Sequence, residues 1–358
     1  MASLNGRPAV DEAVLDIQDL AVEYRSRGSV MRVLPGVDLT ITRGQVVGLV
    51  GESGSGKSTL ALAVLRLLPA NGKITAGRIV LDGTTDLTSI SREQLRRVRG
   101  EKVAMIFQDP LTSLNPTFKI GRQMIDVQTA HAGGRVRWPD RKQFRQRAMA
   151  LLHEVGLPDA DQLMGSYPHQ LSGGMRQRVM TAMALSLEPE LLIADEPTSA
   201  LDVTTEAQIL GLLRQIKASR DLTILFVTHD LSVVAEICDR VVVMYAGQVM
   251  EQGEVADVFR EPQHPYTSAL LDAVATRSHR GQPLNTIPGR VPSLIGQIKG
   301  CRFASRCSYA QDVCRAEEPR PVASGSSEAV RCHMRDPQSG YEHAGLPSAA
   351  APKVVPPP

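Results

Sequence analysis

The feature that most constrains the fold of this chain is a short apolar run that ends abruptly in glycine and serine residues. The run is Val46–Val50, and the segment after it reads Gly51-Glu52-Ser53-Gly54-Ser55-Gly56, followed by Lys57-Ser58-Thr59. A short apolar run bounded by glycines indicates a buried strand, and the residues from Lys57 to Leu68 have a helical pattern. The sequence therefore predicts a strand, a glycine-rich loop and a helix in succession.

This loop matches the Gly-x4-Gly-Lys-Ser pattern of a phosphate-binding loop. Glycines let backbone N–H groups turn toward phosphate oxygens, and a helix N-terminus favours an anion. Lys57 is predicted to reach the β- and γ-phosphates, and the Ser58 hydroxyl to coordinate Mg²⁺. A dinucleotide-binding fingerprint is the alternative, but its glycine spacing differs and it leaves Lys57 without a role. The predicted nucleotide-binding residues of this segment are Gly51, Ser53, Gly54, Ser55, Gly56, Lys57, Ser58 and Thr59.

Three further apolar runs also end in polar residues. They cover 103–107, 191–194 and 222–228, and they are followed by Gln108, by Asp195-Glu196 and by His229. Helical patterns lie between the runs, which predicts an α/β fold with a mostly parallel sheet and crossover helices. Open sheets of this kind bind ligands at the carboxyl ends of their strands.

The chemistry of these strand ends suggests a division of roles. Asp195 is placed to hold Mg²⁺, and Glu196 to orient or deprotonate an attacking water. Gln108 is predicted to reach the metal or the water, and His229 to contact the γ-phosphate. Tyr24 is predicted to stack on adenine. Structural alternatives exist for Asp195-Glu196, His229 and Tyr24: Asp-Glu-Pro can cap a strand, a single His is commonly structural, and an isolated Tyr commonly packs.

Charge and hydropathy exclude several classes of protein. The 40 Lys and Arg residues nearly balance the 38 Asp and Glu residues, so the net charge of +2 argues against nucleic-acid binding. No apolar run approaches the roughly 18 residues that span a bilayer. The N-terminal segment lacks the apolar core of a signal peptide, which predicts a cytosolic chain.

The segment Leu171-Ser172-Gly173-Gly174-Met175-Arg176-Gln177-Arg178 resembles the signature motif of ATP-binding-cassette (ABC) ATPases. The phosphate loop, Gln108, Asp195-Glu196, the D-loop Ser199-Ala200-Leu201-Asp202 and His229 follow that family's order, over residues 14–260. Met175 departs from the commoner Gln. The resemblance implies a P-loop NTPase cassette with an added antiparallel β region and an inserted helical subdomain at about 110–187. It also implies catalytic roles for Glu196, His229 and Gln108, with Mg²⁺ held by Ser58, Gln108 and Asp195.

In that family two cassettes meet head to tail, and each signature motif closes the ATP site of the other. Ser172, Gly173 and Gly174 begin a predicted helix, so their hydroxyl and N–H groups would form a second anion cradle. The resemblance also implies that Asp202 of the D-loop takes part in nucleotide binding. The chain carries one set of motifs, which implies a second ABC ATPase subunit as its partner.

A narrower resemblance, to oligopeptide and dipeptide importers, rests on three segments. They are Phe107-Gln108-Asp109-Pro110-Leu111-Thr112-Ser113-Leu114-Asn115-Pro116, His264-Pro265-Tyr266-Thr267, and Ile287-Pro288-Gly289-Arg290-Val291-Pro292-Ser293-Leu294. It implies peptide import with two transmembrane permeases and an extracytoplasmic peptide-binding protein. The chain would be peripheral, at the cytoplasmic face of the inner membrane. Alternatives are an importer ATPase for nickel or another small solute, a soluble non-transport ABC ATPase and an exporter ATPase.

Four cysteines follow with the spacing Cys301-x5-Cys307-x6-Cys314-x17-Cys332. This spacing leaves an iron–sulfur cluster, zinc, free thiols and disulfides open. The peptide-importer resemblance implies a [4Fe–4S] cluster in a C-terminal extension at 261–335. Neighbouring arginines are predicted to offset the cluster's charge: Arg302, Arg306, Arg315 and Arg331. A Pro- and Ala-rich tail at 336–358 is predicted to be disordered, and Cys238 to be core.

Overall fold

The computed structural model describes residues 12–26, 28–132, 138–199, 201–277, 287–296 and 298–342. The chain divides into two compact units. The first combines the residues up to Thr88 with those from Val227 onward, and the second comprises the residues from Ser89 to Phe226. Each unit is described by itself.

The first unit contains an antiparallel sheet in the order β2-β1-β4-β5. Its strands are β1 (Ala13–Ser26), β2 (Ser29–Thr42), β4 (Gly72–Leu81) and β5 (Thr85–Asp86). The β1–β2 hairpin closes at the Ser26–Ser29 pair, where Gly28 has a φ of 86°. This sheet is the antiparallel β region implied by the cassette resemblance.

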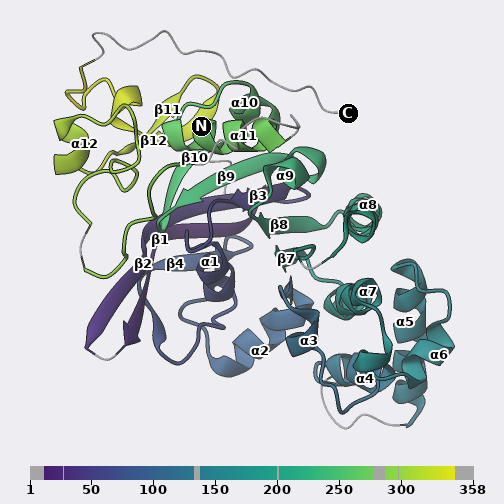
Figure 1. Ribbon diagram of the computed structural model, residues 1–358. Coiled ribbons are helices and arrows are strands. Elements are labelled where there is room, and N and C mark those ends of the chain that lie inside the picture. Colours follow the sequence, from purple (N-terminus) through teal and green to yellow (C-terminus); the bar gives the residue numbers. More distant parts are fainter. Residues whose placement is uncertain are drawn as a thin grey trace. The chain divides into compact units, whose positions relative to one another are not determined.

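A second group of strands in this unit has the order β11-β12-β10-β9-β3. The strands are β3 (Val46–Val50), β9 (Arg240–Tyr245), β10 (Gln248–Glu254), β11 (Pro321–Ser324) and β12 (Ser327–Arg331). β3 runs parallel to β9, whereas β12 pairs antiparallel with β10 through Glu251 and Val330. The C-terminal hairpin β11–β12 is therefore continuous with the sheet that carries the phosphate loop (Figure 1). Sequence patterns did not predict this hairpin, because its strands are short.

The helices of the first unit are α1 (Lys57–Val64), α9 (Leu231–Ile237), α10 (Val255–Arg260), α11 (Pro265–Arg277), α12 (Asp312–Ala316) and the 3₁₀ turn η4 (His333–Arg335). Helix α1 ends four residues before the predicted Leu68. Arg66 adopts a left-handed φ of 51°, and the N–H groups of Arg66 and Leu67 bond the carbonyls of Ala63 and Leu62. This is the Schellman pattern that closes a helix, here without glycine.

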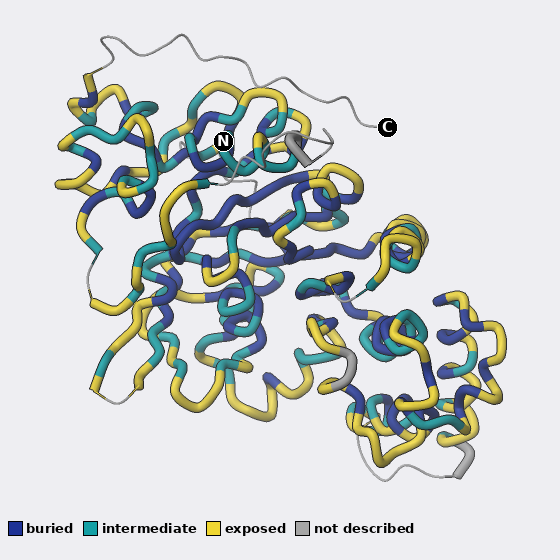
Figure 2. The backbone as a smooth tube through the Cα atoms, in the orientation of Figure 1, coloured by how far each residue is buried: buried dark blue, intermediate teal, exposed yellow. Residues whose placement is uncertain are grey.

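One apolar core joins the sheet of this unit to the C-terminal extension. Tyr245 at the end of β9, Tyr266 in α11 and Phe303 of the cysteine-rich segment form an aromatic trio with centroid separations of 4.6–5.3 Å. Figure 2 shows the buried strands beneath the more exposed extension. Ring pairs at these distances and tilts stabilise a core beyond the area they bury.

The second unit contains β6 (Val103–Ile106), β7 (Leu191–Asp195) and β8 (Thr223–Thr228), whose last two residues lead back into the first unit. β6 and β7 are parallel, with Val103 opposite Leu191. All three strands coincide with predicted apolar runs. The α/β prediction is therefore confirmed here. The sequence revealed these strands because parallel strands buried on both faces are continuous apolar runs.

The helices of the second unit are α2 (Arg92–Glu101), α3 (Pro110–Ser113), α4 (Ile120–Thr129), α5 (Trp138–Glu154), α6 (Ala160–Gly165), α7 (Gly173–Ala184), α8 (Val203–Arg220) and the 3₁₀ turns η2 (Pro168–Gln170) and η3 (Leu185–Leu187). Helices α4 to α7 pack on one another, as Figure 1 shows. Gly121 of α4 lies so close to the Met164 carbonyl that a Cβ would be 2.6 Å from it. Among the helices of the described residues, none is long and apolar enough to cross a membrane.

The predicted disordered tail differs from the structure at its start. The Tyr341 hydroxyl donates to the Tyr309 carbonyl at 2.7 Å, and the Glu342 N–H donates to the Gln311 side chain. Residues 336–342 are therefore held against the extension, because Tyr341 supplies a buried ring that the surrounding composition conceals. Residues 343–358 lie outside the described part of the chain.

Candidate nucleotide-binding site

The glycine-rich loop between β3 and α1 has a backbone that only glycine adopts readily. Gly51, Gly54 and Gly56 have φ values of 151°, 79° and 100°. A Cβ on Gly51 would lie 2.1 Å from the Met244 carbonyl oxygen, and one on Gly56 would lie 2.9 Å from the Leu34 side chain. The glycines are therefore required both for the left-handed turns and for close packing on the strands behind them.

The loop carbonyls bond to protein donors. The Lys57 ammonium donates to the Gly51 and Glu52 carbonyls at 2.7 and 3.1 Å, and the Gly247 N–H donates to the Ser55 carbonyl at 2.8 Å. The C=O and the following N–H of a trans peptide point in opposite directions. The N–H groups of Ser53 and Gly56 therefore point away from these carbonyl partners, as an anion-binding loop requires.

Helix α1 begins directly at the loop and supplies the positive end of its dipole. Gly56 is the N-cap residue, and no side chain caps the helix. Lys57 is 5% exposed, and Ser58 and Thr59 follow in the first turn. A helix N-terminus with a buried lysine and two hydroxyls fits a Mg²⁺-bound triphosphate in donor chemistry.

Tyr24 lies next to this helix start. Its hydroxyl is 3.4 Å from Thr59 Oγ1, and its ring lies against Gly72, where a Cβ would be 2.8 Å from ring carbon Cε1. The structure thus brings together the predicted adenine-stacking residue and the phosphate loop. His229, in the same unit, is exposed directly after β8, and Asp230 caps the following helix α9.

The second unit brings together two predicted catalytic residues. Gln108 Nε2 donates to Glu196 Oε2 at 2.9 Å. Glu196 follows the buried Asp195 at the end of β7 and has a left-handed φ of 46°. A non-glycine residue in this region stores backbone strain, which is common where a side chain must be aimed for function. The carboxylate and amide therefore act as one polar pair at the strand ends.

The signature segment begins helix α7. Ser172 is the N-cap residue, and its hydroxyl accepts the Met175 N–H at 3.3 Å. Ser172 and Gly173 are exposed, while a Cβ on Gly174 would lie 2.6 Å from Thr205 Cγ2. The predicted helix start is present, and its first turn carries exposed backbone donors of the kind that bind anions.

Asp202 has a structural task in this chain. It is the N-cap residue of α8 and accepts bonds from the Thr205 N–H and hydroxyl at 3.0 and 2.8 Å. These hydrogen bonds lower the pKa of the Asp202 carboxyl below its usual range. Another residue of the predicted D-loop, Ala200, lies outside the described residues.

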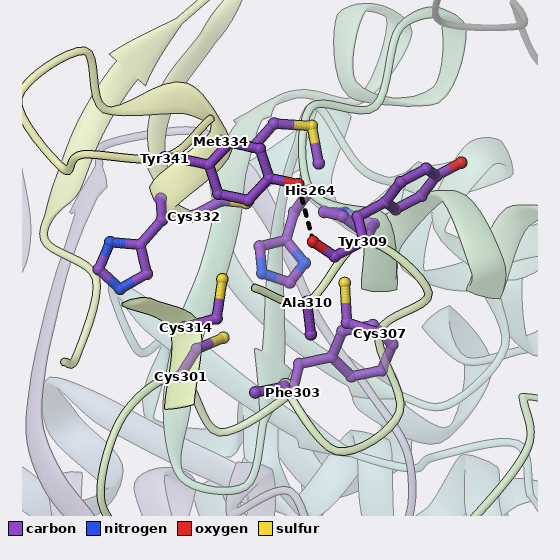
Figure 3. A pocket seen from close by; sticks show the side chains of 13 residues that line it. His264, Cys301, Phe303, Cys307, Tyr309, Ala310, Cys314, Cys332, Met334 and Tyr341 are labelled. Carbon is purple, nitrogen blue, oxygen red and sulfur yellow. Dashed lines mark hydrogen bonds between the residues drawn. The ribbon is translucent and has the colours of Figure 1, made fainter. Parts of the chain in front are cut away.

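The four C-terminal cysteines line one small pocket (Figure 3), together with His264, Phe303 and Tyr341. The Cys301 N–H donates to the Cys314 carbonyl at 2.7 Å, which ties two of them together. Burial, with nearby thiols adding to it, raises the pKa of Cys301 to about 11 and of Cys332 to about 12. Within the described residues, no three His, Cys, Asp or Glu side chains are arranged to hold a metal ion.

The four arginines predicted to offset a cluster's charge have other partners in the structure. Arg302 donates to the Ala246 carbonyl, Arg306 pairs with Glu52, and Arg315 pairs with Asp312. Arg331 pairs with Glu318. Each guanidinium thus has at least one carbonyl or carboxylate partner within the chain, of the kind that its planar fork of donors prefers.

Sequence reasoning also missed two residues that contact the phosphate loop. Tyr266 accepts the Glu52 N–H at 2.9 Å, and Arg306 binds the Glu52 carboxylate. Tyr266 belonged to a motif used only for its resemblance, and Arg306 was assigned to the cysteines. No sequence pattern could place them there, because they are far from the loop along the chain and approach it only in the folded structure.

The comparisons with known proteins agree with this geometry. Residues 34–199 match the ABC transporter family model, and residues 250–314 match the model for the oligopeptide/dipeptide transporter C-terminal region. A putative peptide import ATP-binding protein of Brucella melitensis is 47% identical over 90% of this chain and 97% of its own length. The dipeptide transport ATP-binding protein DppD of Escherichia coli is 43% identical over 90% and 96%. The chain belongs to the ABC transporter family.

Solved structures show the same cassette. An ATP-binding cassette in a dimeric post-hydrolysis state with ADP and Pi is 28% identical, with a TM-score of 0.59 over 67% of this chain and 98% of that one. The structure of cbiO1 from Clostridium perfringens, part of the ABC transporter complex cbiONQ, is 30% identical with a TM-score of 0.58 over 70% of this chain and 92% of that one. The predicted P-loop NTPase cassette fold is thereby confirmed.

Proposed function

We propose that this chain is the ATP-hydrolysing subunit of an importer for dipeptides or oligopeptides. The observation that carries the proposal is that one chain holds a complete set of cassette motifs and a peptide-transporter C-terminal region, and that this region shares an apolar core with the strand before the phosphate loop. Relatives that match along nearly their whole length are named for peptide or dipeptide transport. ATP hydrolysis by such a subunit supplies the free energy for import.

The proposed division of labour follows the chemistry of each side chain. The phosphate loop and Lys57 bind the phosphates. Ser58, Asp195 and Gln108 would hold Mg²⁺, whose charge would neutralise the negative charge that develops on the phosphates. Glu196 accepts the proton of the attacking water, with Gln108 orienting its carboxylate. His229 contacts the γ-phosphate, and Tyr24 stacks on adenine.

We further propose that this chain works with a second cassette, two permease subunits and an extracytoplasmic peptide-binding protein. The exposed Ser172 and Gly173 support the pairing, because their donors are available to the ATP of a partner cassette. The similar cassette solved as a dimer supports it as well. The chain would then lie at the cytoplasmic face of the inner membrane, attached through the permeases. The helical subdomain at about 110–187 would receive them, and residues 14–260 and 261–335 would be the cassette and its extension.

Replacing Glu196 with Gln tests the hydrolytic role. The amide keeps the size of the side chain but accepts no proton, so ATP binding should persist while turnover falls roughly 10²–10⁴-fold. Steady-state ATPase measurements on the assembled transporter give both quantities. Replacing the exposed Glu188 with Gln is a matched loss of charge in the same unit. Near-normal hydrolysis by Glu196→Gln would contradict the assignment.

The four pocket cysteines are proposed to hold a [4Fe–4S] cluster. Their thiols are soft ligands, and their gathering around one buried pocket supports the proposal. Because the thiols do not form a ready ligand set, the cluster would have to draw them together as it assembles. Iron and sulfide analysis of anaerobically purified protein should find about four irons per chain. Cys314→Ser should lose them and Cys238→Ser should keep them; absence of iron from the wild-type chain would refute the cluster.

A further inference from the structure

Glu52 lies inside the phosphate loop, yet its side chain and its backbone N–H are both bound by the C-terminal extension. Arg306 Nη1 and Nη2 approach the two carboxylate oxygens at 2.7 and 3.1 Å, a bidentate pair. The Arg306 side chain is 4% exposed. The Glu52 N–H donates at 2.9 Å to the hydroxyl of the fully buried Tyr266. The loop is thus attached to the extension at a single residue by two independent contacts.

Arg306 is itself fixed before any ligand arrives. Its Nε donates to the Pro288 carbonyl at 2.8 Å, and Nη2 donates to the Ile287 carbonyl at 2.9 Å. Its guanidinium carbon lies 5.7 Å from the centroid of the Tyr245 ring. A planar cation held by carbonyls on one edge and an aromatic ring beside it presents its fork in one orientation.

A second arginine of the same segment supports the loop indirectly. Arg302 is 7% exposed and donates to the Ala246 carbonyl in the turn between β9 and β10. The next residue, Gly247, donates its N–H to the Ser55 carbonyl of the loop at 2.8 Å. Cys301 precedes Arg302 and Cys307 follows Arg306, so the segment that carries the two arginines begins and ends at cysteines of the pocket.

We propose that the cysteine-rich extension positions the phosphate loop for ATP, with Arg306 and Tyr266 as positioning residues that act through Glu52. A carboxylate in a loop that binds a polyphosphate repels its ligand. Pairing with Arg306 neutralises that charge and holds it on the side of the extension. Tyr266 fixes the peptide that follows Gly51, so the N–H groups further along the loop stay in register for the phosphates.

This inference rests on the proposed ATP-binding function of the loop, and the test separates the two. The measurements are the affinity of the full-length chain for a fluorescent ATP analogue, and KM and kcat for ATP in the assembled transporter. If the wild-type chain does not bind the analogue, the proposed function fails. If it binds, the variants decide the role of the extension.

In Arg306→Gln the Glu52 charge is unpaired, so affinity should fall and KM should rise by about tenfold, while kcat at saturation stays within about twofold. Adding Glu52→Gln to that variant should restore most of the affinity, because the repelling charge is gone. Arg315→Gln removes an equal charge beside another cysteine, from an exposed side chain paired with Asp312, and should bind as the wild type does.

Wild-type affinity in Arg306→Gln would overturn the proposal. So would a double variant as weak as the single one, since that result assigns Arg306 a role in folding alone. If Arg306→Gln does not fold, Tyr266→Phe decides, because it removes one hydroxyl and keeps the buried ring. That variant should raise KM about threefold or more with little change in melting temperature; an unchanged KM would overturn the positioning role.

Discussion

Glu251 of β10 is a buried carboxylate at the junction between the cassette sheet and its extension. It is 0% exposed. Its Oε1 accepts the Gln263 N–H and the Ser327 hydroxyl, both at 2.7 Å, and its Oε2 accepts the His264 N–H at 2.9 Å. One side chain therefore bonds the loop before α11 and the strand β12. We predict that Glu251→Gln loosens this junction.

The magnitude follows from the geometry of these acceptors. A glutamine side chain has one oxygen, so either orientation of its amide turns an NH₂ toward a backbone N–H of Gln263 or His264. At least one charge-assisted bond is lost and one buried donor is left without an acceptor. The two effects together should cost about 2–4 kcal/mol of unfolding free energy. For a unit of this size that corresponds to roughly 4–16 °C in melting temperature.

The assay is thermal unfolding combined with hydrogen exchange at the Gln263 and His264 amides. Glu261→Gln is the matched control, because Glu261 lies in the same connection, is exposed and loses the same charge. We expect a large drop in melting temperature and faster exchange for Glu251→Gln only. If Glu251→Gln melts within about 1 °C of Glu261→Gln, the carboxylate does not join the extension to the sheet, and the argument is wrong.

Three further predictions concern the same unit. Lys57→Ala should abolish measurable ATP binding while Lys73→Ala, at an exposed position, leaves it unchanged; equal affinities would remove Lys57 from the site. Gly247→Ala should cost about 2 kcal/mol or more in urea unfolding, since its Cβ would lie 1.8 Å from the Val33 carbonyl at a φ of 87°; an unchanged midpoint would contradict this. Burial lowers the pKa of His264 to about 3. Below pH 6.5 the unfolded chain then binds the extra proton, so stability should fall by about 2 kcal/mol from pH 7 to pH 5. His264→Asn should flatten that slope, and an unaltered slope would assign it to other groups.

The local parts of the fold followed from local patterns. The runs that became β3, β6, β7 and β8 were identifiable because strands buried on both faces are continuously apolar. The end of α1 was not, since Arg66 adopts the left-handed turn that usually marks a glycine. The hairpin β11–β12 was missed because short strands gain their stability from the neighbour they pair with, here β10.

The site divides in the same way. Spacing alone identified the phosphate loop and placed Gln108 and Glu196 at strand ends, and the structure joins those two by a hydrogen bond. The partners of the arginines in the extension were not predicted, because charge near cysteines in the sequence does not say which acceptor a guanidinium will reach. That choice depends on which carboxylate or carbonyl the fold brings within about 3 Å.

What the order of residues settled by itself is the chemistry: glycines that permit left-handed turns, a lysine at a helix start, and carboxylates after apolar runs. These features act over a few residues, so they can be identified from the sequence alone. The link between the extension and the phosphate loop required the tertiary structure, because Glu52 and Arg306 are separated by 254 positions. Such a contact is specified by the packing of Tyr245, Tyr266 and Phe303 around a common core, and no local pattern encodes it.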